Sequence, residues 1–363
     1  MIAKSSPETR RKQYLGYTIN MQKGSIKSLS DNFSVGGWKV TSRFIQVALG
    51  IFWLLDGLLQ LQRQMFTSHF ASLVIAPAAQ FEPIFVAGPI HLFIHIFLLH
   101  PAIFNSFAAL TQLTLGILIL LRRTTKIGLI ASMAWGLLVW VIGEGYGGIF
   151  SGHTSLLMGA PGAALLYIIL AIAVLPRVGK KTARPPYWLA FVWAFFWIGG
   201  AIYQLLPGQN TVSSLSAMIA SNGFSQPGWL ASLDFHVGSI INGFGTPLAL
   251  QSGMHMSANQ MAMMQTEGAS GYWFILLAAL FQLGIGIAVF LPRAYRLIGI
   301  SLGIIFSLMF WVIGQSFGRI FTGLATDPNA APLFIALAVA IVGCSTLGSD
   351  LAGFFKRLER TIT

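Results

Sequence analysis

Long apolar runs separated by short polar and basic segments dominate the sequence. A transmembrane helix takes about 20 apolar residues, or roughly 17 if it runs straight across the bilayer, and eight runs meet this length. They lie near residues 44–61, 105–121, 127–146, 159–175, 187–206, 272–291, 297–317 and 331–347. We therefore predict an all-α integral membrane protein with eight transmembrane helices.

The basic residues fall almost entirely on one side of this arrangement. Of the 22 Lys and Arg residues, only Arg63 and Arg319 lie on the side opposite the other 20. Cytoplasmic segments of membrane proteins are enriched in Lys and Arg, so both termini are predicted to be cytoplasmic and the protein to lie in the plasma membrane. The net charge of +12 is then a signal of membrane orientation, not of nucleic-acid binding.

The composition agrees with this assignment. Hydrophobic residues make up 55% of the chain and charged residues 9%, whereas a soluble domain carries about 25% charged residues. The chain has one cysteine, Cys344, which excludes an intrachain disulfide and a cysteine-based zinc site.

A further apolar stretch, within residues 83–101, contains His91, His95 and His100 between flanking prolines. If it crossed the membrane, the basic loop that follows would move to the outer side. We therefore predict a helix that lies on the outer face or dips into it. Its counterpart in the second half of the chain is predicted near residues 228–243.

The sequence contains an internal duplication. Residues 140–150 and 311–321 share the pattern Trp-Val-Ile-Gly-x-x-x-Gly-x-Ile-Phe at an offset of 171 positions, and residues 52–60 match 196–204 at an offset of 144. Such self-similarity indicates a repeated structural unit. The glycines of each Gly-x-x-x-Gly motif are predicted to mediate close contact between membrane helices.

These matches divide the chain into two parallel four-helix repeats. Four spans in each repeat give both the same orientation, unlike the inverted repeats of many transporters. The predicted parts are a basic cytoplasmic tail (1–43), the first repeat (44–175), a cytoplasmic linker (176–186), the second repeat (187–347) with an enlarged exterior segment (207–271), and a cytoplasmic tail (348–363).

Two acids lie within predicted spans and are candidate catalytic residues. Asp56 and Glu144 both fall toward the outer end of a span, and the second repeat has Gly200 and Gln315 in their places. An ionisable residue inside a membrane span usually marks a functional site, and a desolvated carboxyl group suits proton exchange. The structural alternatives are that both acids reach the outer interface, or that Glu144 pairs with Arg319.

Three histidines are candidate cofactor ligands. His91 and His95 are spaced so that both imidazoles lie on one face of a helix, which suits a metal ion, a quinone carbonyl or a proton relay. Glu82 and His69 are near enough in sequence to complete such a site, and His100 follows at the end of the stretch. The alternative is an interfacial helix whose polar face consists of histidine.

The insertion in the second repeat contains Met254, His255 and Met256. Thioether and imidazole ligands suit Cu(I), so these residues are a candidate copper site on the outer side. The structural alternative is an apolar helix in which methionine fills irregular gaps.

Each half, with four spans, a long first exterior segment and a short basic loop between its second and third spans, resembles the DoxX/DoxD-like family of four-helix membrane proteins. The resemblance implies the membrane subunit of a quinone-linked oxidoreductase, with a small sulfur or thiol compound as electron donor and other subunits of a membrane redox complex as partners. Under this expectation, we propose Asp56, Glu144, His91 and His95 as the residues for proton handling or quinone contact. The alternatives are a small-solute or copper transporter, and a non-catalytic subunit that anchors a respiratory complex.

Overall fold

The computed structural model describes residues 40–180, 183–206, 211–223, 226–244 and 269–344. The chain falls into two units, Met1–Val40 and Thr41–Thr363, and all the helices below belong to the second unit. The described residues are helical or form turns and loops, and they contain no β-strand.

Every one of the eight predicted apolar runs contains a helix. These helices are α2 (Ser42–Leu59), α5 (Pro101–Leu120), α6 (Thr125–Leu138), α7 (Ala163–Val174), α8 (Leu189–Gln204), α13 (Ala269–Ala288), α14 (Arg293–Ile313) and α15 (Ala330–Gly343). Five helical stretches are long and apolar enough to cross a membrane: those of α2, α5, α13 and α14, and α6 extended to Gly143. The chain is therefore an all-α membrane protein, and α7, α8 and α15 are apolar helices of less than spanning length.

The backbone just ahead of two of the shorter helices is left-handed. Gly159 and Gly162 have φ values of +104° and +98°, so the helix predicted from residue 159 begins only at α7. Asn329 has φ +69° and its side-chain oxygen accepts a 2.6 Å hydrogen bond from the Ala330 N–H, which starts α15. At 1.5 Å per residue, helices of 12 and 14 residues extend about 18 Å and 21 Å, short of the roughly 30 Å of a hydrocarbon core.

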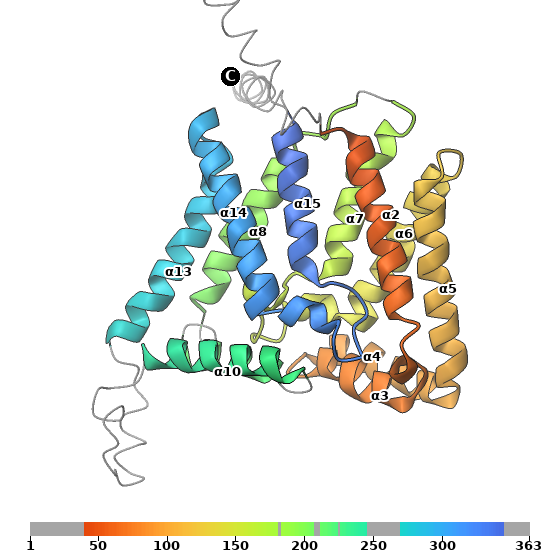
Figure 1. The fold of residues 1–363 in the computed structure, drawn as a ribbon, viewed down its shortest axis with the longest axis horizontal. Coiled ribbons are helices and arrows are strands. Elements are labelled where there is room, and N and C mark those ends of the chain that lie inside the picture. The colour runs from red at the N-terminus through yellow and green to blue at the C-terminus, as the bar shows by residue number, and fades with distance from the viewer. Residues whose placement is uncertain (1–39, 181–182, 207–210, 224–225, 245–268, 345–363) are drawn as a thin grey trace, which may run out of the picture. The chain divides into compact units, whose positions relative to one another are not determined.

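Successive upright helices alternate in direction, so that the start of α2 and the end of α15 lie at the same end of this unit (Figure 1). The α5–α6 turn, the α7–α8 connection and the α13–α14 turn lie at that end as well. Hydrogen bonds join these segments: the Ser42 N–H donates to the Ala183 carbonyl oxygen (2.9 Å), and Arg43 Nη2 donates to the Leu120 carbonyl oxygen (3.1 Å). This is the end that carries the basic loops.

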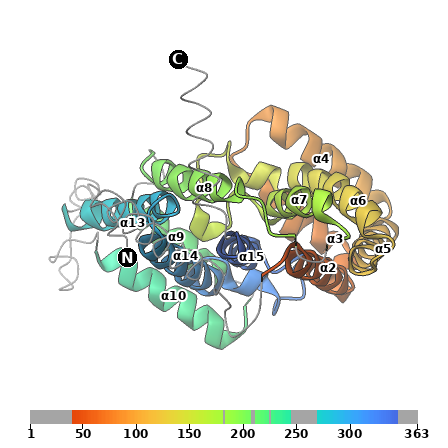
Figure 2. The same ribbon diagram turned by 90° about the horizontal axis from the view of Figure 1, so that it is seen from above.

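Helices α7 and α15 form the centre of the bundle (Figure 2). Leu166, Leu170 and Leu337 on these two helices are at most 1% exposed. A helix that is apolar all round is typical of such an enclosed position. The outer helices pack in pairs, α2 against α5 and α8 against α13, and Gly50 of α2 approaches Gly116 of α5 closely enough for backbone contact.

Two helices lie across the ends of the upright helices, at the end opposite the basic loops (Figures 1 and 2). They are α4 (Ile84–Leu99) and α10 (Gly228–Gly243). Both occupy segments that the sequence predicts as outer-face helices. Beside α10 lies α9 (Val212–Asn222), and the Ser216 hydroxyl of α9 donates a 2.6 Å hydrogen bond to the Gly238 carbonyl oxygen.

Candidate functional site

The turn after α6 and the turn after α14 have the same backbone conformation. Glu144 has φ −113° and ψ −1°, and Gln315 has φ −110° and ψ −2°. Two residues later, an aromatic residue takes φ 57° in the first turn and 56° in the second, followed in both by a glycine at 68°. The shared sequence pattern therefore encodes a left-handed turn at the end of each helix that lies opposite the basic loops.

A tryptophan at the end of each helix fixes the loop that follows the turn. Trp140 Nε1 donates to the Pro161 carbonyl oxygen, and Trp311 Nε1 donates to the Pro328 carbonyl oxygen, both at 2.8 Å. These loops lead directly into α7 and α15. Each indole thus sets the position at which the next central helix begins.

The glycines of the first motif have a role different from the predicted one. A Cβ at Gly143 would meet only Val139 of its own helix, at 3.5 Å. Gly147 has φ +68°, and a Cβ there would collide with the Pro161 carbonyl oxygen. The prediction of helix–helix packing is therefore wrong for this pair, because the α-helix has ended before the second glycine, which permits a turn instead.

Glu144 caps the start of a central helix. Its two carboxylate oxygens lie 3.1 Å and 3.2 Å from the backbone nitrogen of Ala164, in the first turn of α7. The first N–H groups of a helix have no partner within the helix and carry a partial positive charge, so they favour an acceptor such as a carboxylate. These contacts hold the Glu144 side chain against the first turn of α7.

Gln315 performs the same capping with one addition. Its Oε1 accepts a 3.0 Å hydrogen bond from the Ala331 N–H at the start of α15. Its Nε2 faces the carbonyl oxygens of Leu156 and Leu157 at 3.5 Å and 3.4 Å, on the loop of the other half. A carboxylate has no donor for these carbonyls, which gives a physical reason for an amide at this position.

Asp56 lies on α2 and is 2% exposed. The Tyr167 hydroxyl of α7 donates a 2.6 Å hydrogen bond to Asp56 Oδ2, whereas Asp56 Oδ1 is buried without a hydrogen-bond partner. The Trp53 ring stacks at a tilt on Tyr167, with 4.5 Å between centroids, and its Nε1 is also buried without a partner. An acceptor and a donor are thus left unpaired beside Tyr167.

A third acid, Asp327, belongs to the same site. It lies in the loop between α14 and α15, where its carboxylate accepts hydrogen bonds from the Thr326 hydroxyl and the Asn329 N–H, each 2.7 Å long. It is close enough to Asp56 and Glu144 to interact electrostatically with both. Burial raises the pKa of the Asp327 carboxyl above its ordinary value.

Sequence reasoning missed Asp327 because it falls between two predicted spans. A signal was nevertheless present: residues 327–331 read Asp-Pro-Asn-Ala-Ala, and residues 160–164 read Ala-Pro-Gly-Ala-Ala at the same place before a central helix. Aligning these two segments singles out an acid that only the second half carries.

Asp56, Glu144, Asp327 and Tyr167 are close enough to interact electrostatically with one another, and we call these four residues the acid cluster. Asp56 and Tyr167 are buried, whereas Glu144 and Asp327 are partly exposed. The interactions that the described residues supply to its three acids come from other acids, hydroxyls and backbone amides, and none from Lys, Arg or His. Several buried negative charges without a cation carry a large desolvation and repulsion cost. Protonation of Asp327, the member of the cluster that lies in a loop, would lower this cost.

A mostly apolar pocket of about 230 Å³ borders the loop that follows Glu144. Its lining comes from this loop, including Ala160 and Pro161, and from α8, including Gly200 and Tyr203. The Tyr203 hydroxyl donates to the Ile149 carbonyl oxygen at 3.0 Å. Pro161, which lines this pocket, also accepts the hydrogen bond of the Trp140 indole, and Glu144 caps the helix that begins two residues later.

The predicted histidines are not part of the acid cluster. His91, His95 and His100 are exposed on α4 or at its end. His69 has its Nδ1 3.2 Å from the Thr67 hydroxyl, and Glu82 faces the Ser151 backbone. Within the described ranges, no group of three His, Cys, Asp or Glu residues is placed to hold a metal ion.

Two further predictions concern residues away from the cluster. The proposed copper ligands Met254, His255 and Met256 lie outside the described residues. Arg319 does not pair with Glu144, whose carboxylate caps α7 instead. The Arg319 Nε is buried without a hydrogen-bond partner, and burial lowers the pKa of this guanidinium.

Comparison with known proteins assigns no family to this chain. No protein-family model, no curated protein and no solved structure matches it.

Proposed function

We propose that the chain consists of two parallel four-helix units with eight membrane crossings and cytoplasmic termini. The matching turns at Glu144 and Gln315 and the matching indole bonds of Trp140 and Trp311 support the repeat. The three short helices would complete their crossings through the loops that precede or follow them. The basic loops gathered at one end support the orientation.

We propose that the protein is the membrane subunit of a quinone-linked oxidoreductase and that the acid cluster handles its protons. The observation that carries this proposal is a group of three carboxyls and one phenol to which the described residues supply no basic partner. Reduction of a quinone to the quinol consumes two electrons and two protons. Groups that hold a proton inside a bilayer can supply protons to such a reaction or accept them from the reverse one.

The apolar pocket beside the cluster supports the same proposal. Its volume of about 230 Å³ suits one small ring, and the α8 side is shaped by glycine, since a Cβ at Gly199 would meet no atom within 4 Å. A quinone head group here would lie one loop away from Glu144. The electron donor and the other subunits of the complex, which the DoxX/DoxD-like resemblance suggests, remain part of the proposal.

The first experiment measures bound quinone. The protein is purified in mild detergent, extracted with solvent and assayed for quinone, alongside the Asp56→Asn/Glu144→Gln double variant. Asp234→Asn is the matched control, because Asp234 is likewise buried and accepts a 2.6 Å hydrogen bond from a hydroxyl, that of Ser316, outside the cluster. We expect quinone in the wild type and control and loss in the double variant; quinone absent from all three would contradict the proposal.

A proton-linked transporter of a small solute is the second candidate, and one observation favours it. The acid cluster takes Asp56 and Glu144 from the first half and Asp327 from the second, so that a relative movement of the halves would change its proton affinity. Solute-dependent acidification in liposomes, lost in Glu144→Gln, would support transport. Copurification of partner proteins with neither quinone nor flux would instead indicate an anchoring subunit.

A further inference from the structure

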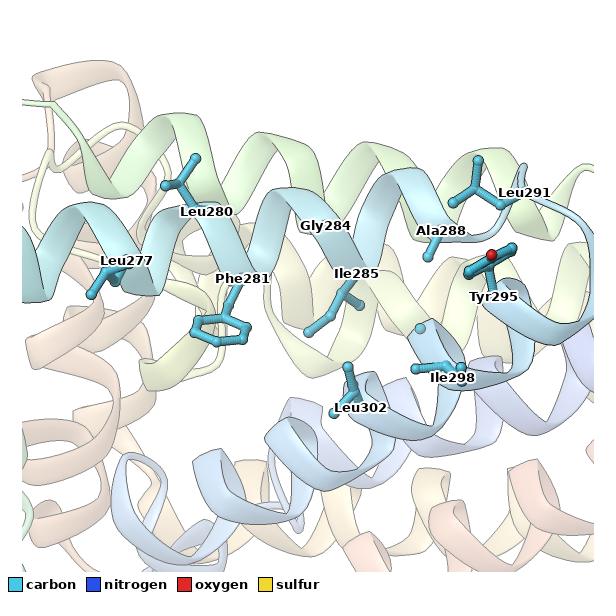
Figure 3. Close-up of a pocket in the computed structure, with 11 residues that line it drawn as sticks. Leu277, Leu280, Phe281, Gly284, Ile285, Ala288, Leu291, Tyr295, Ile298 and Leu302 are labelled. Atoms are coloured by element: carbon cyan, nitrogen blue, oxygen red, sulfur yellow. The ribbon is translucent and has the colours of Figure 1, made fainter.

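An apolar groove lies between α13 and α14, away from the acid cluster. It has a volume of about 400 Å³. Figure 3 shows Phe281 and Ile285 of α13 and Leu302 of α14 pointing into the space between the two helices. The lining is almost entirely aliphatic and aromatic, with the Tyr295 side chain at the end near the α13–α14 turn.

A glycine opens this groove on the α13 side. A Cβ at Gly284 would meet no atom within 4 Å, so the space above this residue is empty of protein. The sequences of α5 and α13 align through Ala-Ala-Leu-x-Gln-Leu, and this alignment places Thr114 of α5 at the position of Gly284. The second half of the chain thus has an open notch where the first half carries a side chain.

The groove has the length of one acyl chain in one leaflet. From Leu277 to Ala288 it follows α13 for about 16 Å at 1.5 Å per residue, and half of a hydrocarbon core is about 15 Å thick. Both helices are long and apolar enough to cross the membrane. A lipid chain lying along them would fill the groove without leaving its leaflet.

The charges at one end of the groove indicate which kind of lipid head group would lie there. Leu291 and Tyr295, which line this end, flank Arg293, and Arg296 lies on the next turn of α14. Arg293 and Arg296 are close enough to repel one another. Two adjacent guanidinium groups at the edge of a bilayer attract an anionic phosphate head group.

We propose that the groove between α13 and α14 is a binding site for one anionic phospholipid. One acyl chain lies over Gly284, and the phosphate lies beside Arg293 and Arg296. The chemistry requires both parts of the ligand, because the groove supplies no polar group along its apolar length and the arginines supply no apolar contact for the chain. Inorganic phosphate alone is therefore not the ligand.

The test uses native mass spectrometry of the full-length protein in detergent, titrated with phosphatidylglycerol or with phosphatidylcholine of the same acyl chains. We expect one tightly bound phosphatidylglycerol and markedly weaker phosphatidylcholine binding. Arg293→Gln/Arg296→Gln should weaken the anionic lipid by about 30-fold, the loss expected for two basic residues at a lipid surface. Gly284→Leu, which fills the notch, should weaken both lipids by at least about tenfold.

The first half supplies matched controls. Arg122→Gln/Arg123→Gln changes the equivalent α5–α6 turn, and Thr114→Leu changes the residue that aligns with Gly284. Leucine favours a helix more than glycine does, so Gly284→Leu should fold, and the melting temperature of each variant checks this. Equal binding of the two lipids, unchanged binding in folded Gly284→Leu, equal loss in the controls, or competition by inorganic phosphate would each overturn the proposal.

Discussion

The hydroxyl of Tyr167 donates a 2.6 Å hydrogen bond to Oδ2 of Asp56, joining a central helix to an outer one inside the membrane bundle. The other carboxylate oxygen of Asp56 is buried without a hydrogen-bond partner, so this single bond is what satisfies the side chain. The stability of the protein at this buried acid therefore depends on the Tyr167 hydroxyl.

Replacing Tyr167 by Phe should destabilise the protein by about 1–3 kcal/mol, because it leaves a buried acceptor without its donor. Thermal unfolding in detergent measures the effect. Asp56→Ala combined with Tyr167→Phe should cost less than the sum of the two single changes, because each removes the same hydrogen bond. Strictly additive costs would show that the two side chains do not depend on one another.

Glu144 and Gln315 should respond differently to exchange of acid and amide. Glu144→Gln keeps an acceptor for the Ala164 N–H and should leave the melting temperature nearly unchanged. Gln315→Glu should be clearly destabilised, because a carboxylate would face the carbonyl oxygens of Leu156 and Leu157. Glu144→Ala, which removes the cap, should cost about 0.5–2 kcal/mol. Equal losses for the two exchanges would contradict this account.

The turn glycine and the helix glycine of the first motif should also differ. Gly147→Ala forces a side chain into left-handed backbone and against the Pro161 carbonyl oxygen, so a loss of at least about 1–2 kcal/mol is expected. Gly143→Ala meets only Val139 at ordinary contact distance and should be tolerated. If helix–helix packing governed the motif, Gly143→Ala would be at least as harmful, and the ranking of the two melting temperatures decides between these roles.

Asp327 should make the folded state less stable as the pH rises. Burial raises its folded pKa above that of an unfolded Asp, about 3.9, so folding favours the protonated form. Its contribution is fully present below the unfolded pKa and is lost as the pH rises through the folded pKa. Asp327→Asn keeps an acceptor for the Asn329 N–H and should lose less stability between acidic and alkaline pH than the wild type.

Melting temperatures of the wild type and Asp327→Asn across this pH range measure that difference. Asp234→Asn is the comparison, since burial also raises the pKa of Asp234, which lies on α10 outside the cluster. Parallel curves for the wild type and Asp327→Asn would show that Asp327 has the same pKa in the folded and the unfolded state, which would contradict this prediction.

The sequence predicted the positions of the helices more accurately than their lengths or the contacts of the site. Apolar runs locate all eight upright helices, because period and composition suffice to mark a membrane helix. They do not reveal that α7 begins late, since that depends on left-handed backbone at Gly159 and Gly162, or that α15 ends at Gly343. Asp56 and Glu144 were found because an acid within an apolar run is conspicuous.

Asp327 was missed for the complementary reason: an acid in a polar loop carries no signal until the fold buries it. The capping role of Glu144 was also invisible, because it depends on a helix that begins 19 residues later in the chain. The histidines of α4 are a different case. Their helical spacing is real, but in the structure they lie exposed on α4 or at its end, apart from the acid cluster.

The acid cluster draws residues from both sides of the linker at 176–186: Asp56 and Glu144 precede it, and Asp327 follows it. The corresponding position in the first half is Ala160, and those of the two early acids are Gly200 and Gln315. Two copies of either half alone would therefore assemble a bundle with an incomplete set of carboxyls. Carrying both halves on one polypeptide guarantees a one-to-one pairing of the unlike halves, and a gene split at the linker would need both fragments in the same cell to rebuild the site.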